Sequence, residues 1–300
     1  MEDRTRGFLW AVFASVCLST VPAVVKIGLT DGADPLQLLV PRMVLGAALL
    51  WLWIGVTRPH RLRIEPRGLR YCALAGGVNA VNLLLFYLGL RRVGASVAIL
   101  IFSIYPALLL LLLHLRGESA NRRDLLRLGL ALGGIYLVAE AGGAADPIGV
   151  AYMLACAALY AVYMLVIHTR LVSYPASTTS LWIVTFLTCG VLAMRPWVTA
   201  PGPLGLTGWG VVVWSAVVGI TIARVATMEG VRLIGSAESA LLLPVETILS
   251  VAWAALILGE RISASQTAGA ALILTSVLLA TALRRRRRGR LTRLTGDGML

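Results

Sequence analysis

The sequence predicts an all-α membrane protein, with ten transmembrane helices arranged as two inverted repeats of five helices each. Three observations lead to this prediction. Of the 300 residues, 58% are hydrophobic and only 14% are charged, whereas soluble domains have about 25% charged residues. Apolar stretches of about 20 residues recur along the chain. The second half of the chain also repeats sequence patterns of the first half.

Ten apolar stretches are long enough to cross a membrane as helices. A helix rises about 1.5 Å per residue, so about 20 residues cover a hydrocarbon layer of about 30 Å. Backbone groups in lipid need partners within their own segment, which favours helices, and Leu108–Leu115 (LLLLLLHL) lacks the alternation of a strand barrel. The predicted spans are Phe8–Leu29, Pro35–Val56, Leu69–Leu90, Ala95–Leu115, Leu125–Ala141, Ile148–Thr169, Ser177–Met194, Gly205–Gly230, Ser236–Leu258 and Ala264–Leu283.

The distribution of positive charge orients the chain. The 27 Lys and Arg residues give a net charge of +13. With the N-terminus placed in the cytoplasm, most of them fall on the cytoplasmic side, which is the bias of a multi-pass protein in a cell's inner (plasma) membrane. Both termini are then cytoplasmic. The basic tail at 284–300, which contains RRRRRGR, is expected to anchor on anionic lipid, and no nucleic-acid partner is expected.

An internal duplication divides the chain. The segment Gly89–Ala98 (GLRRVGASVA) resembles Gly230–Ser239 (GVRLIGSAES), and a Gly-Glu pair ends the next apolar span in both halves. Each half holds five spans, and because five is odd, the second half enters the membrane from the opposite side. We therefore expect a first repeat at 1–142 and a second, inverted repeat at 146–283, an arrangement that recurs in secondary transporters.

These features resemble the EamA family of the drug/metabolite transporter superfamily, and within that superfamily the aromatic amino-acid exporters. The resemblance is carried by the Gly-x-Arg-x-x-Gly pattern before the fourth and ninth spans, the Gly-Glu pairs, Arg42 in the second span and the ten-span duplication. It implies a metabolite exporter, commonly of amino acids, with a central cavity lined by the first, third, fourth, sixth, eighth and ninth helices. The family often has Glu-Pro in the ninth span, where this chain has Glu246-Thr247 and its proline at Pro244.

Glu246 is the central candidate for a functional residue. It lies near the middle of the ninth span, where an unpaired charge costs at least about 2.5–3.5 kcal/mol. Its carboxyl group should therefore face the bundle interior or a wet cavity, pair with a donor, or be protonated. Pro244 in the same span and Pro106 in the fourth lack an amide hydrogen and are expected to break their helices near mid-membrane. Broken helices mark transporter substrate sites, and a purely structural role is the alternative for all three residues.

Few other polar residues fall near the midplane of the predicted spans, and some aromatic residues accompany them. Amides and hydroxyls there can hold a carboxylate, Glu246 can accept an ammonium group, and aromatic rings offer surface to an apolar side chain. Packing between helices is the alternative role for each of them. The candidate substrate-binding residues are Asn79, Asn82, Ser103, Tyr105, Tyr160, Tyr163, Trp214, Ser239 and Glu246, with Pro106 and Pro244 as helix breaks.

The predicted function is secondary transport, with export of small metabolites and in first place amino acids with large apolar or aromatic side chains. Export of cationic or lipophilic drugs and a non-transporting membrane scaffold are the alternatives. Phosphate-bearing substrates would need cationic clamps near the midplane, whereas the intramembrane cations are placed toward span ends. Neither H-E-x-x-H nor G-x-S-x-G occurs, so no enzyme, metal or cofactor is expected. The partners are a small-molecule substrate and the bilayer, and a monomer suffices.

Some expectations concern packing alone. Arg42 is expected to extend toward the outer surface, and Arg224 to form an ion pair with Glu238 near the inner end of the eighth span. The pattern G-x-x-x-G at Gly129–Gly133 (GLALG) predicts a close helix–helix contact in the fifth span. The four cysteines fall in apolar spans without a Cys-x-x-Cys pair, so each is expected to be a small buried hydrophobe.

Overall fold

The computed structural model describes residues 2–116, 122–140, 146–195, 203–239 and 242–276. Every regular element in these ranges is a helix, and none is a strand, which confirms the all-α class for this part of the chain. Long apolar runs form helices because a helix satisfies its own backbone hydrogen bonds where water is absent.

In the first half, the helix starts have clear causes in the sequence. The Asp34 carboxylate accepts a hydrogen bond from the Leu36 amide at 3.0 Å, and the Gln37 side chain accepts one from the Asp34 amide, so a capping box begins α2. Proline lies in the first turn of α2, α3 and α5, where its missing amide hydrogen has no cost. The helices are α1 (Glu2–Thr30), α2 (Pro35–Thr57), the 3₁₀ turn η1 (Pro59–Arg61), α3 (Pro66–Arg92), α4 (Ala95–Phe102), α5 (Tyr105–Leu115) and α6 (Arg122–Glu140).

In the second half, two stretches are wound as π-helix, which the sequence did not predict. The Asp146 carboxylate begins α7 by accepting a hydrogen bond from the Ile148 amide at 2.9 Å. α10 is bent at Gly235, whose φ of 80° favours glycine. The helices are α7 (Pro147–Val166), the π turn η2 (Ile167–Leu171), α8 (Ala176–Met194), α9 (Leu206–Trp214), the π-helix η4 (Ser215–Ile222), α10 (Ala223–Ser239) and α11 (Leu243–Leu258), and a further helix follows at 264–276.

Seven described segments are long and apolar enough to cross a membrane, when helices that continue one another are counted together. They match the predicted first to fourth and sixth to eighth spans. In the predicted fifth and ninth spans the apolar helical segments are shorter, at Gly129–Val138 and Pro244–Leu258. The tenth span is described only to residue 276. The multi-pass fold is thus supported, whereas the count of ten and the repeat boundaries stay predictions, and the tail at 284–300 lies outside the described residues.

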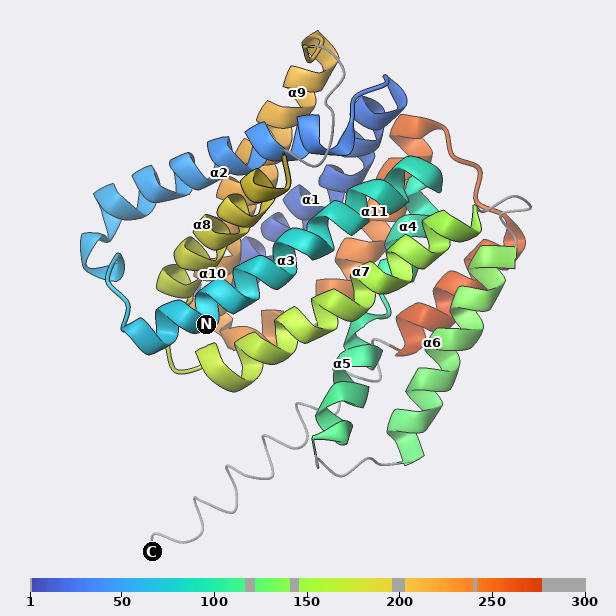
Figure 1. Ribbon diagram of the computed structural model, residues 1–300. Helices are drawn as coiled ribbons and strands as arrows, with labels where there is room; N and C mark the ends of the chain where they lie inside the picture. Colours follow the sequence, from blue (N-terminus) through green and yellow to red (C-terminus); the bar gives the residue numbers. More distant parts are fainter. Residues whose placement is uncertain (1, 117–121, 141–145, 196–202, 240–241, 277–300) are drawn as a thin grey trace, which may run out of the picture.

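The two halves of the chain pack on each other in matching pairs of helices. α1 packs along η4 and α10, and its counterpart α7 packs along α3, beside which it runs in Figure 1. In the same way α2 contacts α9 and η4 while α8 contacts α3, and α1 contacts α11 while α7 contacts α4 and α5. Each contact therefore has a counterpart in which the halves exchange roles, as expected of a duplicated unit.

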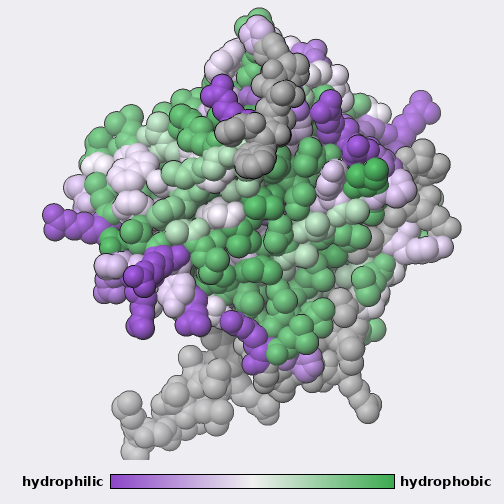
Figure 2. Space-filling view, in the orientation of Figure 1, coloured by the Kyte–Doolittle hydropathy of each residue, from purple (hydrophilic) through white to green (hydrophobic). Residues whose placement is uncertain are grey.

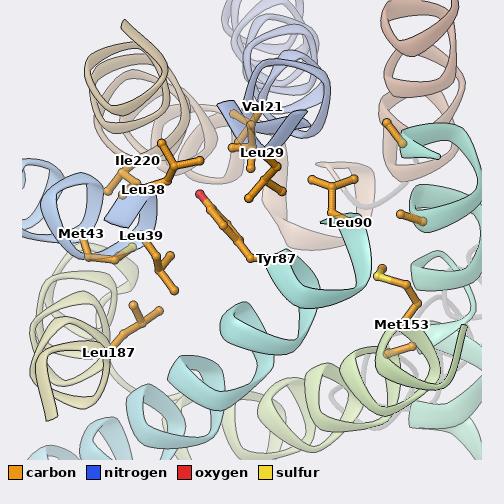
Figure 3. Close-up of a cluster of buried hydrophobic side chains, with 14 of the residues drawn as sticks. Val21, Leu29, Leu38, Leu39, Met43, Tyr87, Leu90, Met153, Leu187 and Ile220 are labelled. Atoms are coloured by element: carbon orange, nitrogen blue, oxygen red, sulfur yellow. The ribbon is translucent and has the colours of Figure 1, made fainter. Parts of the chain in front are cut away.

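An apolar surface surrounds an apolar core. Figure 2 shows hydrophobic side chains over the middle of the visible face and hydrophilic side chains gathered toward its edges. Large hydrophobic residues such as Val56 and Leu256 are about three-quarters exposed, at 75% and 76%, as expected of side chains that face lipid. Inside, side chains of α1, α2, α3, η4 and α8 interdigitate, and Figure 3 shows part of this core around Tyr87.

Arg42 lies in this core, and the expectation that it extends toward the outer surface is wrong. Only 8% of the residue is exposed, and its Nη1 donates a hydrogen bond to the Tyr87 hydroxyl at 2.6 Å. In Figure 3 the Tyr87 hydroxyl points from α3 toward Leu38 of α2 and Ile220 of η4. The Arg42 side chain therefore ties α2 to α3, since both ends of this hydrogen bond are buried.

The close contact predicted at Gly129–Gly133 lies one residue further along α6. A Cβ at Gly129 would meet no atom of another element within 4 Å, and a Cβ at Gly133 only the tip of Leu272 at 4.0 Å. A Cβ at Gly134 would stand 2.7 Å from the backbone oxygen of Gly269. α6 therefore meets the helix at 264–276 backbone to backbone, through Gly134 and not through the predicted pair.

The four cysteines are free thiols. Cys17, Cys72 and Cys156 are buried as expected, whereas Cys189 on α8 is exposed, so the expectation is wrong for that residue. No cluster of three or more His, Cys, Asp or Glu side chains in the described part of the chain could hold a metal ion. The cysteines thus act as small packing residues in three of the four positions.

Candidate functional site

Two interrupted helices contact each other across the two halves of the chain. α4 and α5 are separated at Ser103, and Pro106 lies in the first turn of α5. α11 begins with Pro244 in its first turn. A proline cannot donate the backbone hydrogen bond that would carry a helix through it. The hydroxyls of Ser103 and Thr247 lie 3.1 Å apart, so a hydrogen bond links the two interruptions.

Five aromatic rings gather beside the first interruption. Tyr105 and Tyr160 have ring centroids 4.6 Å apart, and Tyr160 and Tyr163 have centroids 5.2 Å apart. Phe102 lies 5.0 Å from Tyr160 and 5.7 Å from Phe86, both in edge-to-face contact. Such pairs stabilise one another by about 0.5–1.5 kcal/mol beyond simple burial. These residues of α3, α4, α5 and α7 are called the aromatic cluster below.

Glu246 lies beside the aromatic cluster. It is in the first turn of α11, about 18 Å along the helix from Leu258, and it is partly exposed. Its carboxylate interacts electrostatically with Tyr160. Among the side chains that the structure describes, none donates a hydrogen bond to it. A carboxylate at this depth, to which the described side chains supply no donor, can bind a ligand that brings its own hydrogen-bond donors.

Arg224 is also near these tyrosines and is a functional candidate that the sequence analysis missed. The helix η4–α10 continues to Gly235, so Arg224 is about 16 Å from its inner end and not near that end as expected. Its guanidinium lies close enough to Tyr160 and Tyr163 to interact electrostatically with both. The predicted pair with Glu238 stays a prediction, because the Glu238 side chain is outside the described residues.

The structure places the other predicted residues apart from this group or gives them packing partners. Asn82 donates a hydrogen bond to the backbone oxygen of Cys156 at 2.6 Å, which joins α3 to α7. Asn79 is buried on the same helix with 8% exposed. Trp214 donates to the Thr20 hydroxyl at 3.1 Å, and the aromatic contacts found among the described residues do not include it. The Ser239 side chain lies outside the described residues.

Charged groups hold the ends of α3, α4 and α7 on the side opposite the N-terminus. The Glu260 carboxylate, just after α11, accepts hydrogen bonds from the amides of Ala95 at 2.6 Å and Ser96 at 2.9 Å, at the start of α4. The Lys26 ammonium group donates to the backbone oxygens of Leu90 and Val93 at 2.6 and 2.8 Å, at the end of α3. The Glu260 contacts tie the second half of the chain to the beginning of an interrupted helix of the first, and the Lys26 contacts join α1 to α3 within the first half.

A similar contact begins α7. Arg92 forms an ion pair with Asp146, and the hydrogen bond from Arg92 and that from the Ile148 amide hold the pKa of the Asp146 carboxyl below its ordinary value. The charged form of Asp146 is therefore the one that the fold favours. Its contribution to stability is present above the unfolded-state pKa and is lost as the pH falls through the folded-state pKa.

Replacing Glu260 with alanine should loosen the start of α4. The variant loses two hydrogen bonds to a charged acceptor, which for this partly exposed group stabilise the local structure by about 1–2 kcal/mol. We expect the amides of Ala95 and Ser96 to exchange with deuterium about 5–30-fold faster. Glu65→Ala is the matched control, since Glu65 precedes α3 without capping it. Equal exchange in Glu260→Ala and the wild type would show that this cap does not stabilise α4.

A comparison with known families identifies the fold. The EamA-like transporter family matches the chain twice, at residues 5–139 and at residues 147–282. The chain belongs to the EamA-like transporter family. The two matches agree with the duplication seen in the sequence and in the paired helix contacts. The family is one of transporters, and enzymatic catalysis is not part of that description. The resemblance to the aromatic amino-acid exporters within the superfamily is not tested by this match.

The chain is also similar to a bacterial relative and to a solved structure. The "Uncharacterized transporter YcbK" of Bacillus subtilis (strain 168) is 26% identical over 284 residues, which cover 90% of each protein. A crystal structure of another protein is 20% identical and aligns with a TM-score of 0.63 over 94% of this chain and 98% of the other. The first similarity supports membrane transport as the general function, and the second shows the fold alone.

In this EamA-like chain, the aromatic cluster offers a surface that is apolar in its rings and charged at two points. Tyrosine faces and phenylalanine edges suit flat or bulky apolar groups. Glu246 suits a cationic group and Arg224 an anionic one. The described part of the chain gives no set of metal ligands near them. The arrangement suits non-covalent binding of a small organic molecule that has an apolar body and a charged group.

Proposed function

We propose that this EamA-like transporter exports amino acids with large apolar or aromatic side chains from the cytoplasm. The observation that supports the proposal is the aromatic cluster beside Glu246, at the interruption between α4 and α5. Interrupted helices near mid-membrane supply substrate sites in transporters built from inverted repeats. A ring of the substrate can stack on Tyr105 or Tyr160 while its ammonium group meets the carboxylate.

The energetics favour a substrate that carries both an apolar body and a charge. Burying an aromatic side chain stabilises a complex through its large apolar area, and ring contacts add about 0.5–1.5 kcal/mol. A charged hydrogen bond to Glu246 adds orientation, and it is strengthened where water is excluded. A purely lipophilic compound would gain the burial of apolar area and the ring contacts, but it would bring no cationic group to the Glu246 carboxylate.

The proposal includes a location for the protein in the cell. We place it in the inner (plasma) membrane with both termini in the cytoplasm, supported by the excess of arginine in the loops on that side. One chain carries two repeats, so a monomer suffices for a site between them. The expected partners are the substrate and the lipid bilayer.

Flux into liposomes tests the proposed function. Purified protein in liposomes should take up labelled phenylalanine faster than empty liposomes do, and unlabelled tyrosine or tryptophan should compete. Polyphosphorylated compounds should not compete, because a phosphate clamp needs several cations and the described residues beside the aromatic cluster supply one, Arg224. Phenylalanine uptake equal to that of empty liposomes would contradict the proposal.

A second candidate is the export of cationic compounds. A carboxylate beside tyrosine rings also suits a quaternary ammonium group, which is attracted to ring faces. The same liposomes separate the two candidates. Passage of a quaternary ammonium compound without passage of phenylalanine would favour cation export.

A further inference from the structure

Three exposed arginines lie where α3 begins. Arg67 and Arg70 are in the first turns of α3, three positions apart and therefore on one face of the helix. Tyr71 follows them, one turn from Arg67, and the Arg170 guanidinium of η2 lies 5.4 Å from the centre of the Tyr71 ring. Figure 1 shows the beginning of α3 near the end of α7, which η2 continues, and η2 contacts α3. Arg67, Arg70 and Arg170 are called the arginine group below.

The described part of the chain supplies no carboxylate to the arginine group. The ion pairs found among the described residues include none of its three side chains, and all three are exposed. Glu65, which precedes α3, instead accepts a hydrogen bond from the Tyr174 hydroxyl at 3.3 Å. Tyr174 packs against α3 at Gly68, which is about 100° around the helix from Arg67. The positive charge of the group is therefore available to an anion from outside the protein.

An apolar stripe continues from the arginine group along the same face of α3. Leu74 and Val81 follow Arg67 and Arg70 at helical spacing and are 54% and 40% exposed. Between them, a Cβ added at Gly77 would meet nothing within 4 Å, so the surface of the helix is open there. Val81 lies about 16 Å along the helix from Arg70, which is close to half of a hydrocarbon layer of about 30 Å. The stripe thus has the depth of one leaflet.

We propose that this face of α3 binds an anionic phospholipid, with its headgroup phosphate at the arginine group and one acyl chain along Leu74, Gly77 and Val81. Guanidinium groups present N–H donors in a planar fork that matches phosphate oxygens. Clusters of arginine at the end of a membrane helix attract anionic lipids for the same reason. The site lies outside the aromatic cluster and does not depend on the transported substrate.

The continuity of charge and apolar surface favours a lipid over a soluble anion. A soluble anion would contact the arginines alone, whereas one phospholipid covers both the arginine group and the stripe below it. A zwitterionic phospholipid has the same chains but brings a cationic amine near the arginines, which weakens its binding. Because α3 belongs to the first half of the chain and η2 to the second, an anionic headgroup bound by both connects the two halves at this end of the protein.

Quenching by brominated lipid chains tests the inference. A fluorophore on Val81→Cys, in a Cys189→Ser background, reports which lipids lie against the stripe, and the other three cysteines are buried. In vesicles of phosphatidylcholine, we expect brominated phosphatidylglycerol to associate at least about tenfold more strongly than brominated phosphatidylcholine. In Arg67→Gln/Arg70→Gln this ratio should fall at least about tenfold. Arg170→Gln should lower it about fivefold without altering α3, which covers the case in which the double variant does not fold.

Arg116→Gln/Arg232→Gln is the matched control, because it removes two exposed arginines at other helices, after α5 and on α10. It should keep the wild-type ratio. A fluorophore on Leu52→Cys, at a position of α2 that is 65% exposed, should report about equal association of the two lipids.

Two results would overturn the inference. Equal association of the two lipids at Val81, with all arginines in place, would show that the stripe does not select an anionic headgroup. Equal losses in the two double variants would show that the net charge of the protein attracts the lipid, and not this site. The measurement uses no transport substrate, so either result leaves the proposed function as it stands.

Discussion

Replacing Glu246 with glutamine should leave the protein folded in the membrane and remove most of its phenylalanine flux. Glutamine keeps the size of the side chain, and none of the described side chains donates a hydrogen bond that the change would break. The substrate ammonium group loses a charged acceptor, and a hydrogen bond of this kind is worth about 1.5–3 kcal/mol. Flux at low substrate concentration should therefore fall by about 10–100-fold.

The control for this variant is Glu65→Gln, on the segment before α3. Glu65 is a carboxylate outside the aromatic cluster and accepts a hydrogen bond from the Tyr174 hydroxyl at 3.3 Å. Its replacement should leave flux unchanged. Wild-type flux in Glu246→Gln would mean that the carboxylate does not bind the substrate and has a structural role. Failure of the variant to accumulate in the membrane would do the same, because the carboxylate would then be needed by the fold.

The sequence predicted the all-α class and pointed to the main residues of the candidate site because their signals are local. A run of apolar residues about 20 long has one stable form in lipid, and the described part of the chain is helical wherever such a run occurs. Glu246 stands out because a carboxylate is rare in such a run, and Pro106 because it cannot continue a helix. Each of these inferences needs only the residue and its neighbours in sequence.

The depth of Arg224 within its helix could not be predicted, because it depends on where that helix ends. The eighth span was expected to end at Gly230, which placed Arg224 near the surface. The helix instead continues to Gly235, where a φ of 80° bends the backbone. Arg224 is therefore more than one helical turn further from the end of its helix than expected. The π-helix η4 just before it has no clear signal in a stretch of small apolar residues.

Hydrogen-bond partners that are distant in the sequence could not be predicted either. The Asn82 amide was expected to face a substrate, and its acceptor is a backbone oxygen 74 positions away on α7. Arg42 was expected to reach water, yet the Tyr87 hydroxyl satisfies one of its donors inside the core. A buried polar group takes whichever partner the tertiary packing supplies, and periodicity does not encode that choice.

A methyl group added at Gly76 should weaken the whole fold, whereas the same change at Gly77 should not. A Cβ at Gly76 would lie 2.6 Å from the Phe186 Cβ and 2.8 Å from the Ile183 backbone oxygen of α8. Backbone atoms cannot move aside cheaply, so Gly76→Ala must push α3 and α8 apart, which costs about 1–3 kcal/mol. A Cβ at Gly77 would meet nothing within 4 Å, and alanine there gains about 0.5–1 kcal/mol of helix propensity.

Thermal unfolding of the two variants in detergent measures this difference. The pair is matched, since both changes are Gly→Ala at neighbouring positions of one helix. We expect a lower midpoint for Gly76→Ala and an unchanged or slightly higher one for Gly77→Ala. Because α3 belongs to the first half of the chain and α8 to the second, Gly76→Ala should also lower phenylalanine flux by disturbing the seam between the halves. Equal midpoints for both variants would mean that α3 and α8 approach less closely in the membrane than this packing requires.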